Sequence, residues 1–107
     1  MPRSSNDKVP YAYVADGTWP YAALSADAPV SAHYAQALAR NLERALNSSG
    51  QSLRTLAEAT GVNHTTIGRV LGGKVLPDVG TLARLEVALG FQIWPGLAAL
   101  PAVRSAE

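Results

Sequence analysis

The fold is decided by residues 53–70, which read Leu53-Arg-Thr-Leu56-Ala57-Glu-Ala-Thr-Gly61-Val62-Asn63-His64-Thr65-Thr66-Ile67-Gly68-Arg69-Val70. Apolar side chains recur at helical spacing on both sides of Gly61, so the segment predicts two short helices joined by a tight turn. Glycine suits that turn because it adopts the left-handed conformation that closes a helix. Ala57 is small enough for the two helices to approach closely, and Val62 is predicted to fill the space beneath the turn.

The apolar positions of this segment also predict which residues point outward. Leu56, Ile67 and Val70 fall on the inner faces of the two helices and set the angle at which they cross. The second helix then presents a polar face to solvent, made of Asn63, His64, Thr65, Gly68 and Arg69.

A longer helix is predicted before this pair, over residues 32–48. Ser31 would be its N-cap and Gly50 follows its end. Its inner face would carry Leu38, Leu42, Ala45 and Leu46.

Polar caps and glycines delimit the other helices. Ser52 and Asn63 would cap the two helices of the central segment, and Gly72-Gly73 would end the second one. Pro77-Asp78 opens a fourth helix that ends before Gly90, with an apolar stripe of Val79, Leu82, Leu85, Ala88 and Leu89. We therefore expect an all-α class with four to five short helices.

The spacing of residues 53–70 resembles the phage-repressor-like (Xre-type, lambda-repressor-like) helix-turn-helix family. The resemblance extends over residues 31–90 and includes Pro77-Asp78 and the stripe of the fourth helix. It implies a five-helix fold that binds operator DNA.

The resemblance also implies which residues would touch DNA. The third helix would lie in the major groove, where Arg69 could bond the O6 and N7 atoms of one guanine. Arg54 and Ser52 would hold a phosphate at the start of the second helix, and Lys74 would hold another. The full implied set is Ser52, Arg54, Asn63, His64, Thr65, Thr66, Gly68, Arg69 and Lys74.

Three positions depart from the pattern of that family. Leu53 stands where glutamine is common, so it cannot donate a hydrogen bond to DNA. Thr55 replaces the acidic residue of a capping box. Gly68 lies within the third helix, where it costs about 1 kcal/mol relative to alanine and offers no side chain to a base.

Residues 1–30 form an N-terminal arm rich in proline and aromatic residues. Two strands over residues 11–15 and 18–21, joined by a type I′ turn at Asp16-Gly17, would make a hairpin with Pro20 on its edge. An ordered coil laid across the domain explains the same residues equally well. Because disordered tails are poor in aromatic residues, we expect part of the arm to dock.

The C-terminal segment holds more apolar residues than a thin, alanine-rich core needs. Pro95 could start one helical turn, and the tail is assigned to residues 95–107 after a helix-turn-helix domain at 31–94. An exposed apolar patch marks a contact site. The hypothesis is a homodimer interface made of Phe91, Ile93, Trp94, Leu97 and Leu100.

Composition excludes several classes of protein. The 107 residues carry a net charge of +1, no cysteine and two histidines, so no cofactor, metal site or thiol chemistry is expected. No sequence motif of a hydrolase or nucleotide-binding loop is present, which argues against an enzyme. The polar residues 1–8 lack a secretory signal, and no apolar run could span a membrane, so a soluble cytoplasmic protein is expected.

Two functions remain open at this stage. The first is a homodimeric regulator, a repressor, that binds a palindromic operator in double-stranded DNA. The second is an antitoxin or adaptor that binds another protein through the helical scaffold and the aromatic arm. The low net charge favours a dimer, since residues 31–94 hold six basic and four acidic side chains, an excess of only two per subunit.

Overall fold

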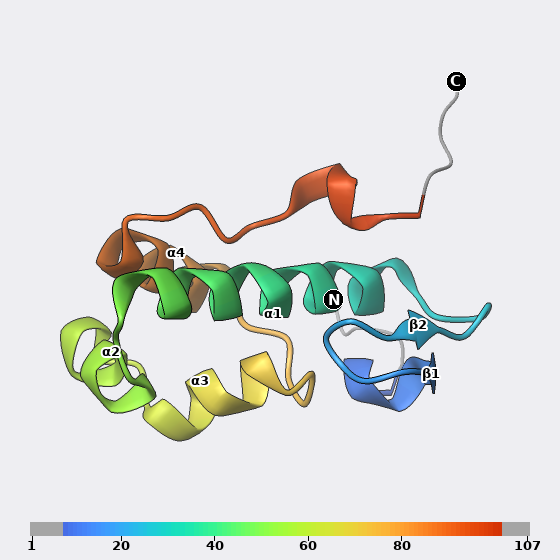
Figure 1. Cartoon of the computed structure of the whole chain (residues 1–107), viewed down its shortest axis with the longest axis horizontal. Helices are drawn as coiled ribbons and strands as arrows, with labels where there is room; N and C mark the ends of the chain where they lie inside the picture. Colours follow the sequence, from blue (N-terminus) through green and yellow to red (C-terminus); the bar gives the residue numbers. More distant parts are fainter. Residues whose placement is uncertain (1–7, 102–107) are drawn as a thin grey trace.

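The computed structural model describes residues 8–101. In chain order the described elements are η1 (Pro10–Tyr13), β1 (Val14–Asp16), β2 (Ala23–Leu24), α1 (Val30–Ser49), α2 (Leu53–Thr60), α3 (His64–Leu71), α4 (Val79–Leu89) and η2 (Gly96–Ala99), where η is a short 3-10 helix. Helix α1 runs through the middle of the molecule, with α2 and α3 on one side and the segment around η2 on the other (Figure 1). The expected mostly α-helical class is confirmed. The expectations placed on residues 1–7 and 102–107 lie outside the described residues.

Helix α1 begins earlier than predicted. Pro29, not Ser31, occupies the N-cap position, and no side chain caps this end. The Pro29 carbonyl accepts a hydrogen bond from the Ala32 N–H at 3.0 Å, so the helix starts at Val30 and Ser31 already lies inside it. Gly50 closes the helix in the left-handed conformation with φ 73°.

The predicted caps of α2 and α3 are confirmed. The Ser52 hydroxyl accepts a hydrogen bond from the Thr55 N–H at 3.0 Å, and the Asn63 side chain accepts one from the Thr65 N–H at 2.7 Å. Gly61 is left-handed with φ 76°, as the turn between the two helices requires.

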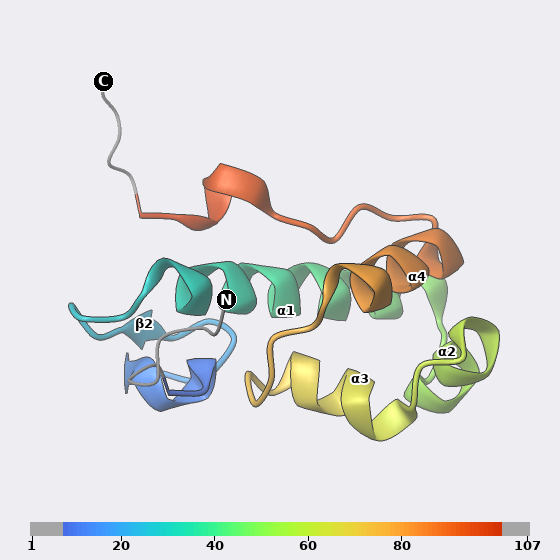
Figure 2. The same ribbon diagram turned by 180° about the vertical axis from the view of Figure 1, so that it is seen from behind.

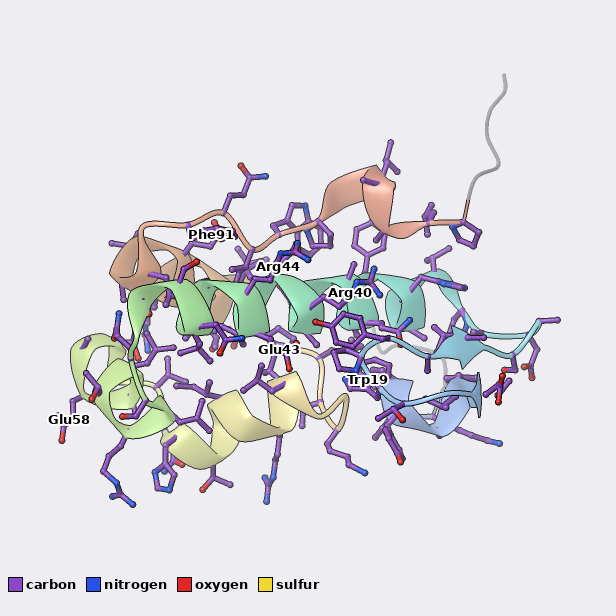
Figure 3. All side chains as sticks on the ribbon, viewed as in Figure 1. Trp19, Arg40, Glu43, Arg44, Glu58 and Phe91 are labelled. Atoms are coloured by element: carbon purple, nitrogen blue, oxygen red, sulfur yellow. The ribbon has the colours of Figure 1, made fainter. Side chains whose placement is uncertain are left out.

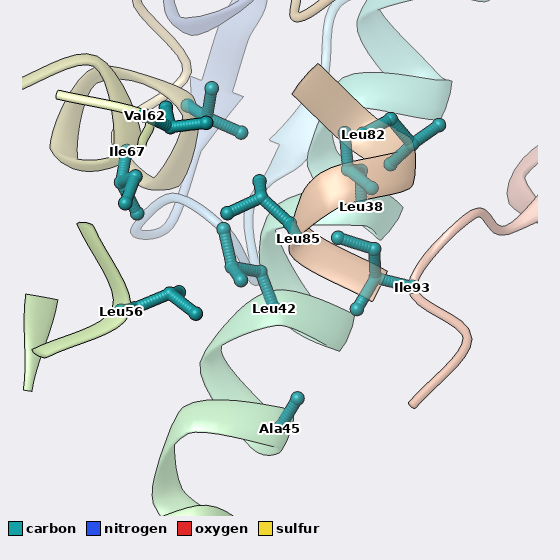
Figure 4. Packing of buried hydrophobic residues seen from close by; sticks show 10 residues of the cluster. Leu38, Leu42, Ala45, Leu56, Val62, Ile67, Leu82, Leu85 and Ile93 are labelled. Carbon is teal, nitrogen blue, oxygen red and sulfur yellow. The ribbon is translucent and has the colours of Figure 1, made fainter. Parts of the chain in front are cut away.

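The main core lies where the four α-helices meet (Figure 4). It consists of Leu38, Leu42, Ala45, Leu56, Val62, Ile67, Val70, Leu82, Leu85 and Ile93. The prediction that Val79 belongs to this core is wrong, because its side chain is 80% exposed. At 3.6 residues per turn it lies about 90° around α4 from the row formed by Leu82, Leu85 and Leu89.

The arm forms a hairpin, but not the one predicted. Strand β1 pairs antiparallel with β2, which begins after a loop of residues 17–22 that contains a cis Trp19–Pro20 bond. Only Gly17 of the Asp16-Gly17 pair has a positive φ, so no type I′ turn forms and the second strand is displaced. Pro20 consequently lies in the loop, and Tyr11 and Tyr13 lie in η1.

Polar and apolar contacts fix this hairpin on α1. The buried Gln36 side chain donates to the Ala22 carbonyl at 3.2 Å and accepts from the Ala22 N–H at 3.0 Å. Arg40 donates to the Pro20 carbonyl at 3.0 Å. Trp19 packs on Ala35 and Ala39 of α1 in a small apolar cluster beside the main core. The expectation that part of the arm docks is therefore confirmed.

The chain after α4 returns along α1. Ile93 is fully buried, and its carbonyl accepts a hydrogen bond from Asn41 at 2.9 Å. The Glu86 carboxylate accepts the N–H groups of Ile93 and Trp94, each at 2.8 Å. These contacts hold residues 91–94 on the helices, and the predicted turn after Pro95 is present as η2.

The cap of α4 predicts a pH dependence of stability. The hydrogen bond from the Thr81 N–H to Asp78, at 2.7 Å, lowers the pKa of the Asp78 carboxyl. Folding therefore favours the ionised carboxylate, whose contribution is complete above the ordinary aspartate pKa and is lost as pH falls through the lowered value. Asp78→Asn keeps a cap without that titration. Urea unfolding should show the wild type losing more stability than Asp78→Asn between pH 6 and pH 3; equal losses would contradict the assignment.

Candidate nucleic-acid interface

Helix α3 is amphipathic, with an apolar face toward the core and a polar face toward solvent. Ile67 and Val70 are almost wholly buried, whereas His64, Thr65 and Arg69 are exposed. Thr66 lies between the two faces and is half-buried. These exposed side chains belong to the set that the resemblance assigned to DNA contacts, and the structure brings them together on two turns of one helix.

The caps of α2 and α3 lie beside this polar face, but their side chains are already engaged. The Ser52 hydroxyl accepts from the Thr55 N–H and donates to the Thr55 hydroxyl at 3.0 Å. The Asn63 oxygen is similarly held by the Thr65 N–H. The contribution of Ser52 and Asn63 to binding DNA is still a prediction, because what the structure shows is their role as N-caps at the start of α2 and α3.

Arg54 and His64 come from different helices and line one shallow hollow at the α2–α3 turn. Both side chains are exposed. Glu58 lines the same hollow and projects outward from α2 (Figure 3), so a carboxylate borders the basic side of this surface. The pair could hold an anion only on the side away from Glu58.

Gly68 faces α2. A Cβ atom at this position would lie 3.8 Å from Leu53 Cδ1, and the residue is half-buried. That distance is an ordinary van der Waals contact, so the space between the two helices would accept an alanine at this position. Gly68 is thus less exposed than the outward position predicted from the sequence, and its contact with DNA stays a prediction.

Lys74 follows α3 and has a neighbour that sequence reasoning missed. Its N–H bonds the Arg69 carbonyl at 2.9 Å, and its ammonium lies 4.0 Å from the centre of the Tyr11 ring. The aromatic residues of the arm were a signal that it docks, but nothing local in the sequence indicates that Tyr11 meets Lys74.

A scan of protein families finds one that fits this geometry. Residues 37–93, more than half of the chain, match the model described as helix-turn-helix domain. The chain belongs to the helix-turn-helix domain family. Such domains place the second helix of the motif in the major groove, so the family suggests DNA as the partner of this chain. No curated protein and no solved structure gives a significant match.

The helix-turn-helix domain carries an apolar surface away from α3. A hollow of about 480 Å³ lies between α1, the start of α4 and the segment around η2. Exposed apolar residues border it, with Val79 80% and Leu97 78% exposed. Its lining among the described residues is Val30, Ser31, Tyr34, Ala35, Leu38, Leu76, Pro77, Val79, Leu82, Trp94, Leu97 and Leu100.

Ile93 does not belong to the predicted dimer interface. Ile93 cannot contact a partner because its side chain is fully buried in the core of this helix-turn-helix domain. Trp94, Leu97 and Leu100 line the apolar hollow, whereas Phe91 borders a different hollow with Val87 at the end of α4. The sequence missed Val30 and Leu76, which belong to the same surface.

Two further findings concern the described part of the helix-turn-helix domain. No helix within residues 8–101 is long and apolar enough to cross a membrane. In the same range, no three His, Asp or Glu side chains gather in a way that could hold a metal ion.

Proposed function

We propose that this chain is a sequence-specific DNA-binding transcriptional regulator of the phage-repressor-like (Xre) type, acting in the cytoplasm as a repressor and without catalytic activity. The observation that carries the proposal is the polar face of α3. His64, Thr65 and Arg69 stand exposed on a short helix whose opposite face is locked into the core. A side chain on a rigid helix can read base edges because its position is fixed before binding.

The small number of basic side chains on this surface favours a homodimer. Arg54, Arg69 and Lys74 are exposed basic side chains on α2, on α3 and just after α3. Three positive charges from one subunit would bind DNA weakly. Two subunits would bring six positive charges to the DNA, with a salt slope on the order of −5. We therefore include a homodimer on a palindromic operator in the proposal.

The apolar surface around Leu97 supports this dimer. It is separate from the polar face of α3, since the segment around η2 and helix α3 lie on opposite sides of α1 in both views (Figures 1 and 2). A second copy could cover Val30, Val79 and Leu97 and leave α3 free. The same exposed surface is what favours the second candidate, an antitoxin or adaptor that binds another protein there or through exposed Tyr21 of the arm.

Leu97→Glu tests the dimer. A charge in the middle of an apolar interface costs several kcal/mol, so this variant should be a monomer at concentrations where the wild type is a dimer. Light scattering measures the mass, and DNA titration at several salt concentrations should give about half the wild-type slope. Val87→Glu is the matched control, because Val87 is 83% exposed and does not line the hollow.

A wild-type protein that is already monomeric at tens of micromolar would contradict the dimer. A dimer that survives Leu97→Glu would place the interface elsewhere. If the wild type binds no DNA but carries another protein that Leu97→Glu releases, the adaptor function replaces the regulator.

A further inference from the structure

The arm is hydrogen-bonded to the end of α3 and to the turn that follows it. The Trp19 indole N–H donates to the Leu71 carbonyl at 2.9 Å, and the Tyr11 N–H donates to the Gly73 carbonyl at 2.8 Å. Tyr11 and Trp19 also meet edge to face, with ring centres 6.4 Å apart. Both ribbon views show η1 beside the end of α3, so the arm extends the same edge of the molecule (Figures 1 and 2).

The position of the Tyr11 ring is not explained by packing in an apolar core. Its side chain is 45% exposed, unlike Trp19 and Tyr13, which are each 8% exposed. The hydrogen bond from the Tyr11 N–H to the Gly73 carbonyl fixes the backbone of Tyr11 next to Lys74, the residue that follows Gly73. The Lys74 ammonium then lies 4.0 Å from the ring centre, within the range of a cation–π contact.

This contact restricts a side chain that would otherwise be free. An exposed lysine samples many rotamers, and ordering it to bind a phosphate costs free energy. A ring that holds the ammonium at the end of α3 reduces that cost while leaving the exposed side of the charge open. Lys74 is thereby kept close to the polar face that includes Arg69, whose carbonyl accepts the Lys74 N–H.

We propose that the docked arm is part of the nucleic-acid interface, with Tyr11 as a positioning residue that holds Lys74 for a phosphate of the DNA backbone. The inference rests on the proposed function and adds a second segment of the chain to it. Tyr11 acts through Lys74 and needs no contact with a base. The effect should therefore be the same on any DNA sequence.

The test uses the full chain and a random-sequence DNA duplex. Tyr11→Leu should weaken binding about two- to five-fold, the range of an exposed cation–π contact, and leave the salt slope unchanged because no charge is lost. Tyr11→Phe keeps the ring and should bind like the wild type. Lys74→Met should lower the salt slope by about 1 per subunit.

Dependence on Lys74 distinguishes positioning from a general effect on the fold. In a Lys74→Met background, Tyr11→Leu should cause no further loss of affinity. Proton NMR gives a readout that needs no DNA: the ring should shift the Lys74 Cε protons upfield in the wild type and in Tyr11→Phe, and not in Tyr11→Leu.

Two kinds of result would contradict the inference, and they differ in whether DNA binding itself is retained. If Tyr11→Leu binds like the wild type, or weakens the Lys74→Met variant equally, Tyr11 does not act through Lys74 although DNA binding stands. If the wild type does not bind the duplex at all, the proposed function fails and the inference fails with it.

Discussion

Gly73→Ala should destabilise the protein by about 2–5 kcal/mol, a large effect for the addition of one methyl group. Gly73 has φ +72°, and an alanine Cβ there would lie 2.6 Å from the Cε2 and Cζ2 atoms of Trp19. The left-handed backbone costs a residue with a side chain about 1–2 kcal/mol. Displacing a packed indole adds about 1–3 kcal/mol.

Gly50→Ala is the matched control for Gly73→Ala. Gly50 has nearly the same φ, +73°, but a Cβ atom there has nothing within 4 Å. It should therefore cost only the backbone term, about 1–2 kcal/mol. Urea unfolding of the two variants separates the backbone penalty from the contact with Trp19.

Tryptophan fluorescence shows where the displaced ring goes. The chain has two tryptophans, so a Trp94→Phe background leaves Trp19 as the reporter. Trp19 is 8% exposed, and its emission should move to longer wavelength in Gly73→Ala as the indole enters water. Equal stability of the two glycine variants with unchanged emission would mean that the arm does not pack on the turn after α3.

Arg69→Ala should weaken binding to a preferred DNA sequence by about 1–3 kcal/mol and relax the preference at one base pair. Its guanidinium is exposed on α3 and has the geometry to bond both acceptors of a guanine. The variant should unfold at the same urea concentration as the wild type, because the side chain is not part of the core. Titrations against the preferred and a scrambled duplex measure the loss of discrimination.

Arg84→Ala controls for the loss of one positive charge. Arg84 is exposed on α4 and lines a hollow with Ala59 and Thr60 of α2, away from the polar face of α3. We expect it to change affinity little and discrimination not at all. If the two arginine variants discriminate equally, net charge and not base contact governs binding, and the role of Arg69 is wrong.

The sequence predicted the parts of the fold that depend on neighbours along the chain. Ser52, Asn63 and Asp78 cap their helices because a short polar side chain needs only the N–H two or three residues later. The polar face of α3 followed from the spacing of Ile67 and Val70 for the same local reason.

The sequence could not predict what tertiary packing decides. Gln36 of α1 binds both backbone groups of Ala22, the residue before β2, and the sequence around the hairpin does not indicate this distant partner. Ile93 looked like one more surplus apolar residue, and only the Glu86 and Asn41 contacts on its backbone show why it is buried. The meeting of Tyr11 and Lys74 joins segments that are far apart in the chain.

The docked arm also changes how the second candidate function should be tested. Deleting residues 9–21 would remove Trp19 from α1 and expose Ala35 and Ala39, so lost binding of a partner could reflect damage to the fold. Substitution of exposed side chains disturbs the arm less: Tyr21, at 61% exposure, gives up only the hydrogen bond that its hydroxyl donates to Glu43 of α1. Leu97→Glu has the same advantage on the apolar surface.

The most direct test of the central claim, that the outer face of α3 reads DNA sequence, is selection of bound duplexes from a random pool with the full chain. The predicted result is enrichment of a palindrome whose half-sites lie about 34 Å apart, one helical turn, as two recognition helices of a dimer require. No enrichment over the starting pool, or equal affinity for selected and scrambled duplexes, would contradict the claim and leave the polar face of α3 without a role in reading sequence.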